Sequence, residues 1–244
     1  MLYFCNEICY HRSGDGMRYE NIVSGKFIDR PNRFIANVQI NGQQVVCHVK
    51  NTGRCKELLK EGAVVYLQHC PSQQRKTAYD LIAVRKDDML VNIDSQAPNK
   101  AVLEWLIKKH PFGEDMVPHS EVFFGDSRFD FMLESKTSDR KLYLEAKGCT
   151  LEKNGIALFP DAPTERGVKH IQGLMDCIGK GYEAAVIILV QMKGVSCFSP
   201  NYETHRAFGE ALVQARKKGV ALLCYDSIVT PETLIVDSPV EIRL

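Results

Sequence analysis

The sequence lacks long apolar runs. No stretch approaches the roughly 20 apolar residues that a membrane-spanning helix needs, and no apolar core of a secretory signal is present. Its nine cysteines show no repeated spacing and their number is odd, so no disulfide framework is predicted. Cys5, Cys9 and His11 come nearest to a zinc motif but lack a second ligand pair. These absences favour a cytoplasmic protein with reduced thiols and no membrane partner.

The chain also has little net charge. The formal value is +1 for 244 residues, although Met17 to Gln96 holds 12 Lys and Arg against 8 Asp and Glu. So small a basic excess is compatible with a phosphate-rich partner and equally with ordinary solvated faces. Hydrophobic residues make up 45% of the chain, which is enough for a real core. The length favours two modest domains over a single one.

Short strands separated by turns dominate the first half. "NIVSGKFI" and "RFIANVQI" lead to Asn41-Gly42, a strong hairpin signal, and "QQVVCHVK" is the predicted return strand. "NTGRCKELLKEG" predicts a turn and a short helix closed by Gly62, before the strands "AVVYLQHC" and "AYDLIAVR". Five strands with a small helix after the third are typical of an OB-fold barrel, which binds oligonucleotides or oligosaccharides.

The second half alternates longer helices with apolar strands. "DSQAPNK" at 94–100 is a polar hinge, so we expect a flexible leader over 1–16, an OB-like domain over 17–94 and a second domain over 95–244. Helices are predicted near 98–110, 164–178 and 202–218, with strands in "EVFFGDSRFDFMLE", "KLYLEAKG", "AAVIILVQ" and "VALLCYDS". Such apolar strands between helices predict a mixed α/β sheet that is buried on both faces.

A hairpin in this half predicts paired carboxylates. A two-residue turn at Gly125-Asp126 places Val122 opposite Phe129, and in the same register Glu121 lies opposite Asp130. Like charges in a direct cross-strand pair are destabilising unless they lie in solvent or share a cation. A divalent metal ion between them is the hypothesis that this register suggests.

The next strand, "LYLEAKGCT", adds an acid and a base. Glu145 and Lys147 share one face because side chains alternate along a strand. Three oxygen ligands from Glu121, Asp130 and Glu145 suit Mg²⁺ or Mn²⁺, with Lys147 orienting water or offsetting charge on a phosphodiester. A surface ion pair is the alternative for each residue alone. Gly148 is expected to end the strand where substrate approaches.

A basic helix follows in "LFPDAPTERGVKHIQGLMD". Asp161 or Thr164 can cap it, and Arg166, Lys169 and His170 share one helical face. That face is suited to a substrate phosphate, whereas an ordinary solvated helix with a buried His170 is the equal alternative.

Several longer motifs identify a known family. "GKFIDRPNRFIANV", "NTGRCKELLKEG", "SRFDFMLE", "LEAKGCTL", "FPDAPTERGVKHI" and "FSPN" resemble the sugar fermentation stimulation protein family from Met17 onward. The resemblance implies an OB-like domain followed by a PD-(D/E)xK restriction-endonuclease-like domain. It also implies binding of DNA without sequence specificity and regulation of maltose metabolism. By motif position, Glu121, Asp130, Glu145 and Lys147 match the nuclease-like site. The hairpin is shorter here than in some relatives, and residues 1–16 lie outside the family pattern.

Two functions follow as hypotheses. The first is metal-dependent cleavage of DNA at the carboxylate site. The second is a non-catalytic, DNA-binding regulator of sugar metabolism, and oligomeric state, including a homodimer, is left open. DNA contacts are predicted for a set of basic residues: Lys26, Arg30, Arg33, Lys50, Arg54, Arg166, Lys169 and His170. Phe27 and Phe34 are alternatives for base stacking or core packing. No feature singles out sugar binding, the third possibility.

Overall fold

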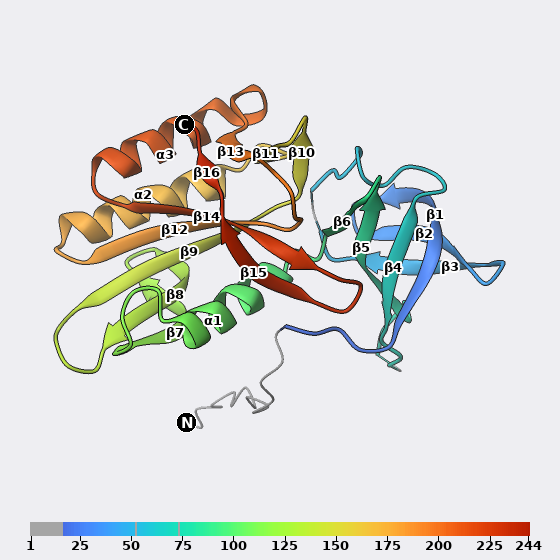
Figure 1. Cartoon of the computed structure of the whole chain (residues 1–244), viewed down its shortest axis with the longest axis horizontal. Helices are drawn as coiled ribbons and strands as arrows, with labels where there is room; N and C mark the ends of the chain where they lie inside the picture. The colour runs from blue at the N-terminus through green and yellow to red at the C-terminus, as the bar shows by residue number, and fades with distance from the viewer. Residues whose placement is uncertain (1–16, 52, 73) are drawn as a thin grey trace.

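The first half of the chain folds into a small barrel. The computed structural model describes residues 17–51, 53–72 and 74–244. Six strands form one sheet in the order β3-β2-β1-β4-β5-β6, and parallel pairing of β3 with β5 closes five of them into a barrel (Figure 1). The predicted OB-like fold is confirmed. The strands are β1 (Ile22–Asn32), β2 (Ile35–Ile40), β3 (Gln43–Val49), β4 (Val64–His69), β5 (Tyr79–Lys86) and β6 (Met89–Asn92).

The hairpin predicted at Asn41-Gly42 joins β2 to β3. Both residues have left-handed backbone angles, with φ of 49° and 82°, as the tight two-residue turn of a hairpin requires. The short helix predicted after β3 is wrong, because the segment up to Gly62 forms turns. Cys55 has a φ of 46°, which a right-handed helix does not allow, and buried Leu58 and Leu59 hold the turns against the barrel core.

The second half is a mixed sheet covered on both faces, as predicted. Its strand order is β15-β14-β12-β9-β8-β7, with β9, β12 and β14 parallel and the other pairs antiparallel. The strands are β7 (Met116–Phe124), β8 (Ser127–Ser135), β9 (Lys141–Cys149), β12 (Glu183–Val190), β14 (Ala221–Val229) and β15 (Leu234–Pro239). A smaller sheet joins β10 (Leu151–Lys153), β11 (Ile156–Phe159), β13 (Cys197–Pro200) and β16 (Glu241–Ile242).

Three helices pack on the mixed sheet. They are α1 (Ala97–Lys109), α2 (Glu165–Gly179) and α3 (Tyr202–Lys217), close to the predicted spans. Trp105 and Leu106 of α1 pack with Leu144 on one face of the sheet, whereas α2 and α3 cover the other face (Figure 1). Thr164 rather than Asp161 caps α2, since its side chain accepts a hydrogen bond from the Gly167 N–H. None of the described helices is long and apolar enough to cross a membrane.

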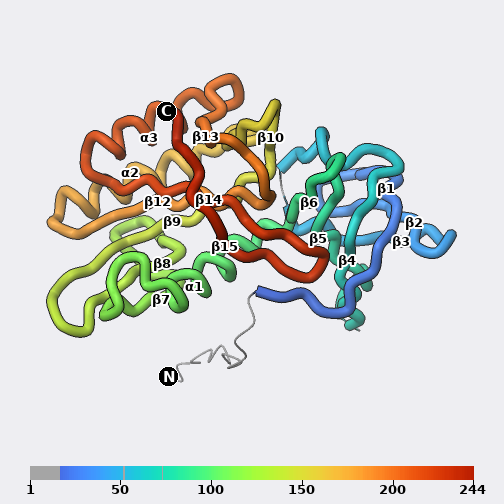
Figure 2. Tube along the Cα trace, viewed as in Figure 1, coloured from blue at the N-terminus to red at the C-terminus, as the bar shows by residue number. Residues whose placement is uncertain are grey.

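The barrel is joined tightly to the mixed sheet. The chain entering the barrel, at Met17–Tyr19, bonds to the β14–β15 hairpin, and the tube in Figure 2 shows these segments side by side. Gln191, just after β12, is 1% exposed and donates its amide to Asn92 Oδ1 at 2.9 Å and to the Asp94 carbonyl at 3.1 Å. Because buried amides are costly to leave unpaired, these bonds fix the two parts relative to each other. The predicted leader lies outside the described residues, and so do Cys5, Cys9 and His11, the residues that come nearest to a zinc motif.

Candidate functional site

The site begins where the pairing of β8 with β9 stops. The backbone pairing ends at Phe131 and Leu144, and farther along β9 the Ala146 N–H donates to Asp130 Oδ2 at 2.9 Å. Asn99, in the first turn of α1, donates to Asp130 Oδ1 at 2.7 Å. The carboxylate of Asp130 thus takes the place of a backbone partner and stands at the end of the ladder, where a ligand can reach it.

Glu145 is the most buried acid of the site. The residue is 1% exposed, and its Oε1 bonds to both Lys147 Nζ and His170 Nδ1. Its Oε2 is buried without a hydrogen-bond partner among the described residues. A buried carboxylate oxygen left unpaired costs free energy, so it marks a place where a cation or a donor from outside the chain would fit.

The two acids have opposite pKa shifts. Burial, followed by the negative charge of Glu145, raises the pKa of Asp130 above its ordinary value. Burial also acts to raise the pKa of Glu145, but the hydrogen bond from His170 and the charge of Lys147 outweigh it and leave that pKa lowered. Glu145 is therefore the more readily ionised of the two acids, and its negative charge disfavours ionisation of Asp130. A cation between them would offset that effect.

His170 supports Glu145 from α2. It is buried, and the Arg166 Nε–H donates to His170 Nε2 at 3.3 Å, which places the imidazole proton on Nδ1, facing Glu145. Phe129 packs edge-on against the ring at 6.1 Å between centroids. The sequence grouped His170 with Arg166 and Lys169 as a basic face, but only the latter two are exposed. The alternative of a satisfied buried histidine describes His170 correctly.

Glu121 occupies a different position from the one predicted. The register is confirmed, since Val122 pairs with Phe129 and Ser120 with Phe131. At Glu121 itself φ is 58°, and its half-exposed carboxylate pairs with Arg128 Nε at 3.0 Å instead of facing Asp130. It still lines, with Asp130 and Asn99, a cavity of about 220 Å³ that opens beside the site. Within the described part of the chain, no three His, Cys, Asp or Glu side chains are already gathered as a metal centre.

Both halves of the chain match models of one family. Residues 28–93 match the "SfsA N-terminal OB domain", and residues 96–233 match the "Sugar fermentation stimulation protein RE domain". The chain belongs to the sugar fermentation stimulation protein family. The first matched span begins inside β1 and covers the rest of the barrel, and the second covers the mixed sheet except β15.

Relatives in this family cover almost the whole chain. A sugar fermentation stimulation protein homolog of Desulfitobacterium hafniense (strain Y51) is 52% identical over 228 residues, which are 93% of this chain and 99% of that protein. A homolog of Ruminiclostridium cellulolyticum is 50% identical over 228 residues, or 93% of this chain and 100% of the other. The solved structure of Pyrococcus furiosus SfsA in complex with Ca²⁺ matches with a TM-score of 0.83 at 25% identity, over 93% of this chain and 98% of that one.

The barrel residues predicted to bind DNA divide into two groups in this family member. Arg30 donates to four backbone carbonyls, including those of Gly53 and Asn51 at 2.9 and 2.6 Å, and Lys50 pairs with Asp94 at 2.8 Å. These two cations hold the barrel together. The side chains left accessible to a ligand are those of the exposed residues Lys26, Arg33 and Arg54.

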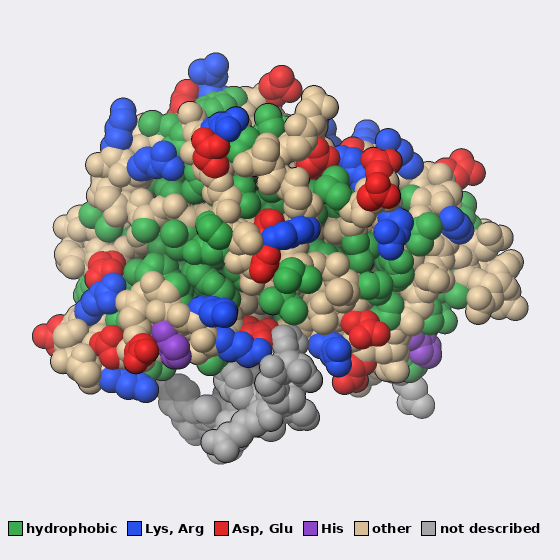
Figure 3. Space-filling view, in the orientation of Figure 1, with side chains coloured by type: hydrophobic (Ala, Val, Ile, Leu, Met, Phe, Trp, Pro, Cys, Tyr) green, Lys and Arg blue, Asp and Glu red, His purple; other side chains and the backbone are tan. Residues whose placement is uncertain are grey.

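The two phenylalanines considered for base stacking, Phe27 and Phe34, also differ. Phe27 is 4% exposed and belongs to the core, so the core alternative holds for it. Phe34 is 46% exposed, and the guanidinium of Arg33 lies 4.7 Å from its ring centroid. In Figure 3 charges of both signs are interspersed over the visible face, without a single-sign patch. Any phosphate contacts on the barrel therefore come from individual cations around Phe34 rather than from a broad basic surface.

Several residues of the site gave no sequence signal. Asn99, which holds Asp130, is an ordinary first-turn helix residue, and Gln191 follows an apolar strand. The prediction that the strand ends at Gly148 is wrong, because β9 continues to Cys149. A Cβ on Gly148 would lie 2.2 Å from Gln191 Oε1 and 2.7 Å from Pro98 Cγ, so the glycine is required by close packing. Such contacts join residues far apart in the sequence, and only the folded chain reveals them.

Proposed function

We propose that this protein is a metal-dependent phosphodiesterase that hydrolyses DNA. The observation that carries the proposal is the unpaired, buried Oε2 of Glu145 beside Asp130, whose pKa is raised by burial and by the charge of Glu145. Two adjacent carboxylates with a spare oxygen and a lysine form a donor set of hard oxygens, which suits Mg²⁺ or Mn²⁺. The Pyrococcus furiosus relative was solved in complex with Ca²⁺, an ion of the same preference.

Asp130 and Glu145 would hold the ion, and their arrangement fits it. When bound, the ion would supply Lewis-acid polarisation of a phosphoryl oxygen and lower the pKa of water. The bonds from His170 and Lys147 keep Glu145 ionised and oriented. Glu121 would join the set only after its carboxylate leaves Arg128, so we assign it a secondary role at the rim of the cavity.

Lys147 is the residue that contacts the reacting phosphate group of the substrate. Its side chain is 18% exposed and its ammonium already lies at the Glu145 carboxylate. From there it can orient the attacking water or offset negative charge that develops on the phosphoryl oxygens. In the reaction, water adds to phosphorus, one P–O bond to sugar breaks, and the departing oxygen is protonated. Arg166 and Lys169, exposed on α2, are placed to bind flanking phosphates.

The test is cleavage of end-labelled single-stranded, duplex and branched DNA with Mg²⁺ or Mn²⁺. We expect cleavage that EDTA stops and that Lys147→Ala lowers by at least about 100-fold. Glu121→Gln should lower it less than Asp130→Asn. Cleavage that survives Lys147→Ala and Asp130→Asn unchanged would come from a contaminant or another site, and it would overturn the assignment.

A non-catalytic DNA-binding role is the second candidate. The exposed Phe34 with Arg33 over its ring favours it, since an aromatic with an adjacent cation can stack on a base and hold its phosphate. Affinity for DNA should then fall steeply as salt rises, because phosphate contacts release counterions. Affinity that is flat from about 50 to 200 mM salt would contradict this role. Phe34→Ala should weaken this binding.

A further inference from the structure

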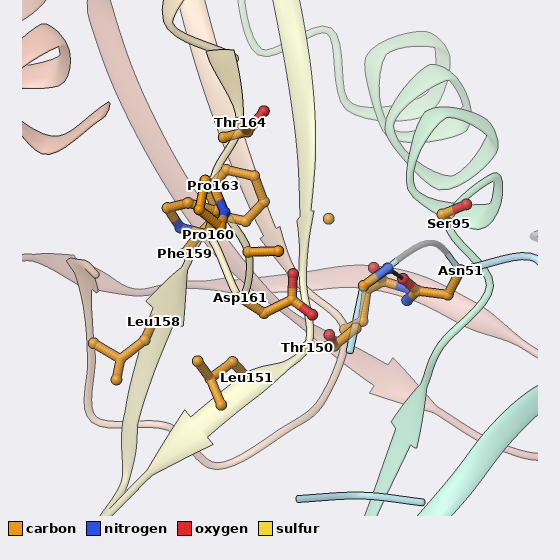
Figure 4. A pocket seen from close by; sticks show the side chains of 14 residues that line it. Asn51, Ser95, Thr150, Leu151, Leu158, Phe159, Pro160, Asp161, Pro163 and Thr164 are labelled. Atoms are coloured by element: carbon orange, nitrogen blue, oxygen red, sulfur yellow. Dashed lines mark hydrogen bonds between the residues drawn. The ribbon is translucent and has the colours of Figure 1, made fainter. Parts of the chain in front are cut away.

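A second cavity lies where the barrel meets the mixed sheet. Its volume is about 260 Å³, and its walls come from the loops after β3 and β6, from the end of β9 and from the segment between β11 and α2. In Figure 4 the Asp161 carboxylate points across this space toward Thr150 and Asn51, with Ser95 on the far side and Pro160 and Pro163 beside it. At about 30 Å³ per water, the space holds a flat ring system.

The lining has acceptors and no cation. Among the described residues that surround it, none is Lys or Arg, and Asp161 is the one acid. Asp161 Oδ2 accepts from the Arg54 N–H at 3.0 Å, whereas its Oδ1 has no partner in the described part of the chain. A phosphate or another anion would be repelled here. The ligand that fits has hydrogen-bond donors and a flat apolar surface.

Gln191 supplies an independent acceptor. It is 1% exposed, and its Nε2 donates to three acceptors of the barrel, whereas its Oε1 receives no hydrogen bond from any described residue. That oxygen opens onto the cavity, where a water or a ligand can donate to it. Since Gln191 lines the same cavity as Asp161, two unsatisfied acceptors belong to one space.

The cavity adjoins the carboxylate site. Gly148 lines it and follows Lys147 directly on β9, and Pro98, which packs on Gly148, precedes Asn99, the partner of Asp130. At about 3.3 Å per strand residue, Gly148 lies roughly 10 Å along β9 from Glu145. That separation is comparable to the reach of one nucleotide from its base to a neighbouring phosphate.

We propose that this cavity binds one unpaired nucleobase, with guanine preferred, on the strand whose phosphate lies at Asp130 and Glu145. The proposal rests on the proposed function and adds its substrate class. Guanine presents two adjacent donors, N1–H and N2–H₂, which match a carboxylate. Those donors are used in a base pair, so the nucleotide must be single-stranded or extruded from a duplex.

Binding of nucleosides to the full chain, measured by calorimetry without metal, tests the pocket. We expect guanosine to bind at least about tenfold more tightly than adenosine, and inosine, which lacks the N2 amine, to lie between them. Asp161→Asn keeps an acceptor for the Arg54 N–H and should abolish the preference for guanosine over adenosine. The matched control is Asp88→Asn, the same change at an exposed loop residue, and it should leave the preference intact. Equal binding of all nucleosides, or binding of maltose in their place, would overturn the proposal.

Cleavage mapping separates this inference from the function on which it rests. On single strands with one guanine at a varied position, cleavage should follow the guanine, and replacement of that guanine by inosine should weaken the effect. Cleavage without any dependence on base would overturn the pocket and leave the phosphodiesterase standing. Guanosine binding that Asp161→Asn abolishes, in a chain that cleaves no DNA, would support the pocket and refute the phosphodiesterase.

Discussion

At the scale of single residues, the site depends on two carboxylates, Asp130 and Glu145, whose pKa values are shifted in opposite directions. The sequence predicted Asp130, Glu145 and Lys147 together, because strand alternation and hairpin register are simple geometric rules. It could not predict that Glu121 adopts a φ of 58° and pairs with Arg128, since that depends on local backbone energetics. Nor could it choose between a solvated and a buried His170, because burial depends on how α2 packs on β9.

The stability of the metal-free protein should depend on pH through Asp130. Its pKa is raised in the folded state from the ordinary 3.8, so the folded chain retains a proton that the unfolded chain loses. The free energy of unfolding therefore falls as pH rises through the window above 3.8 up to the raised pKa. In the Asp130→Asn variant this position has no carboxyl group to titrate, so that part of the fall in the free energy of unfolding is absent. The Tm of the variant relative to the parent should rise as the pH increases above 3.8, and a difference that stays constant with pH would contradict the account.

Loss of His170 should move the pH profile of activity. Its hydrogen bond helps to keep the pKa of Glu145 low, so His170→Ala should raise that pKa and move the acid limb of the rate profile to higher pH. We also expect a loss of about 10- to 100-fold in rate at neutral pH, as for partners that orient metal ligands. His119→Ala, at an exposed histidine of β7, is the control. A lower rate with an unmoved acid limb would show only a structural role.

At the scale of elements, the long ones were predictable and the short ones were not. All three helices and the strands of the hairpins follow hydrophobic periodicity over many residues. β10, β11, β13 and β16 are two to four residues long and have no period to detect. Parallel pairing with segments distant in the sequence fixes β11, β13 and β16, as in the Ile156 to Cys197 register, and β10 pairs antiparallel with β11. The helix predicted before Gly62 does not form, because the packing of Leu58 and Leu59 against the barrel core outweighs the helical propensity of this segment.

Gly148 tests the packing of the β9 end. Gly148→Ala would push a methyl group into Gln191 and Pro98, so we expect a loss of about 1–3 kcal/mol of stability by chemical denaturation. Gly179→Ala, at the end of α2, meets nothing within 4 Å and should be neutral or slightly stabilising. Equal effects of the two substitutions would refute the close packing described at Gly148.

At the scale of the whole molecule, the barrel and the mixed sheet act as one unit. Lys86 of the barrel pairs with Glu152, and Gln191 bonds into the turn that follows β6, so the carboxylate site and the second cavity are held on one rigid frame. This arrangement matters for function because a strand bound at both places would span the junction. The sequence indicated two domains and a polar hinge, but the buried amide network at the junction carries no local pattern.

Gln191→Met should weaken that junction. The substitution keeps the volume of the side chain but removes the three hydrogen bonds that Gln191 Nε2 donates to Asn92 and Asp94, at a cost of about 0.5–1.5 kcal/mol for each lost bond. Thermal unfolding should then separate into two transitions or shift to lower temperature. The same Tm and a single transition would contradict the role of Gln191 in joining the two parts.

The central claim is that Asp130 and Glu145 hold a divalent ion, and anomalous diffraction from a crystal soaked in Mn²⁺ tests it most directly. We predict a peak between the two carboxylates, within bonding distance of Glu145 Oε2, and its loss in Asp130→Asn crystals soaked in the same way. A parent crystal with no anomalous peak at these carboxylates would contradict the account.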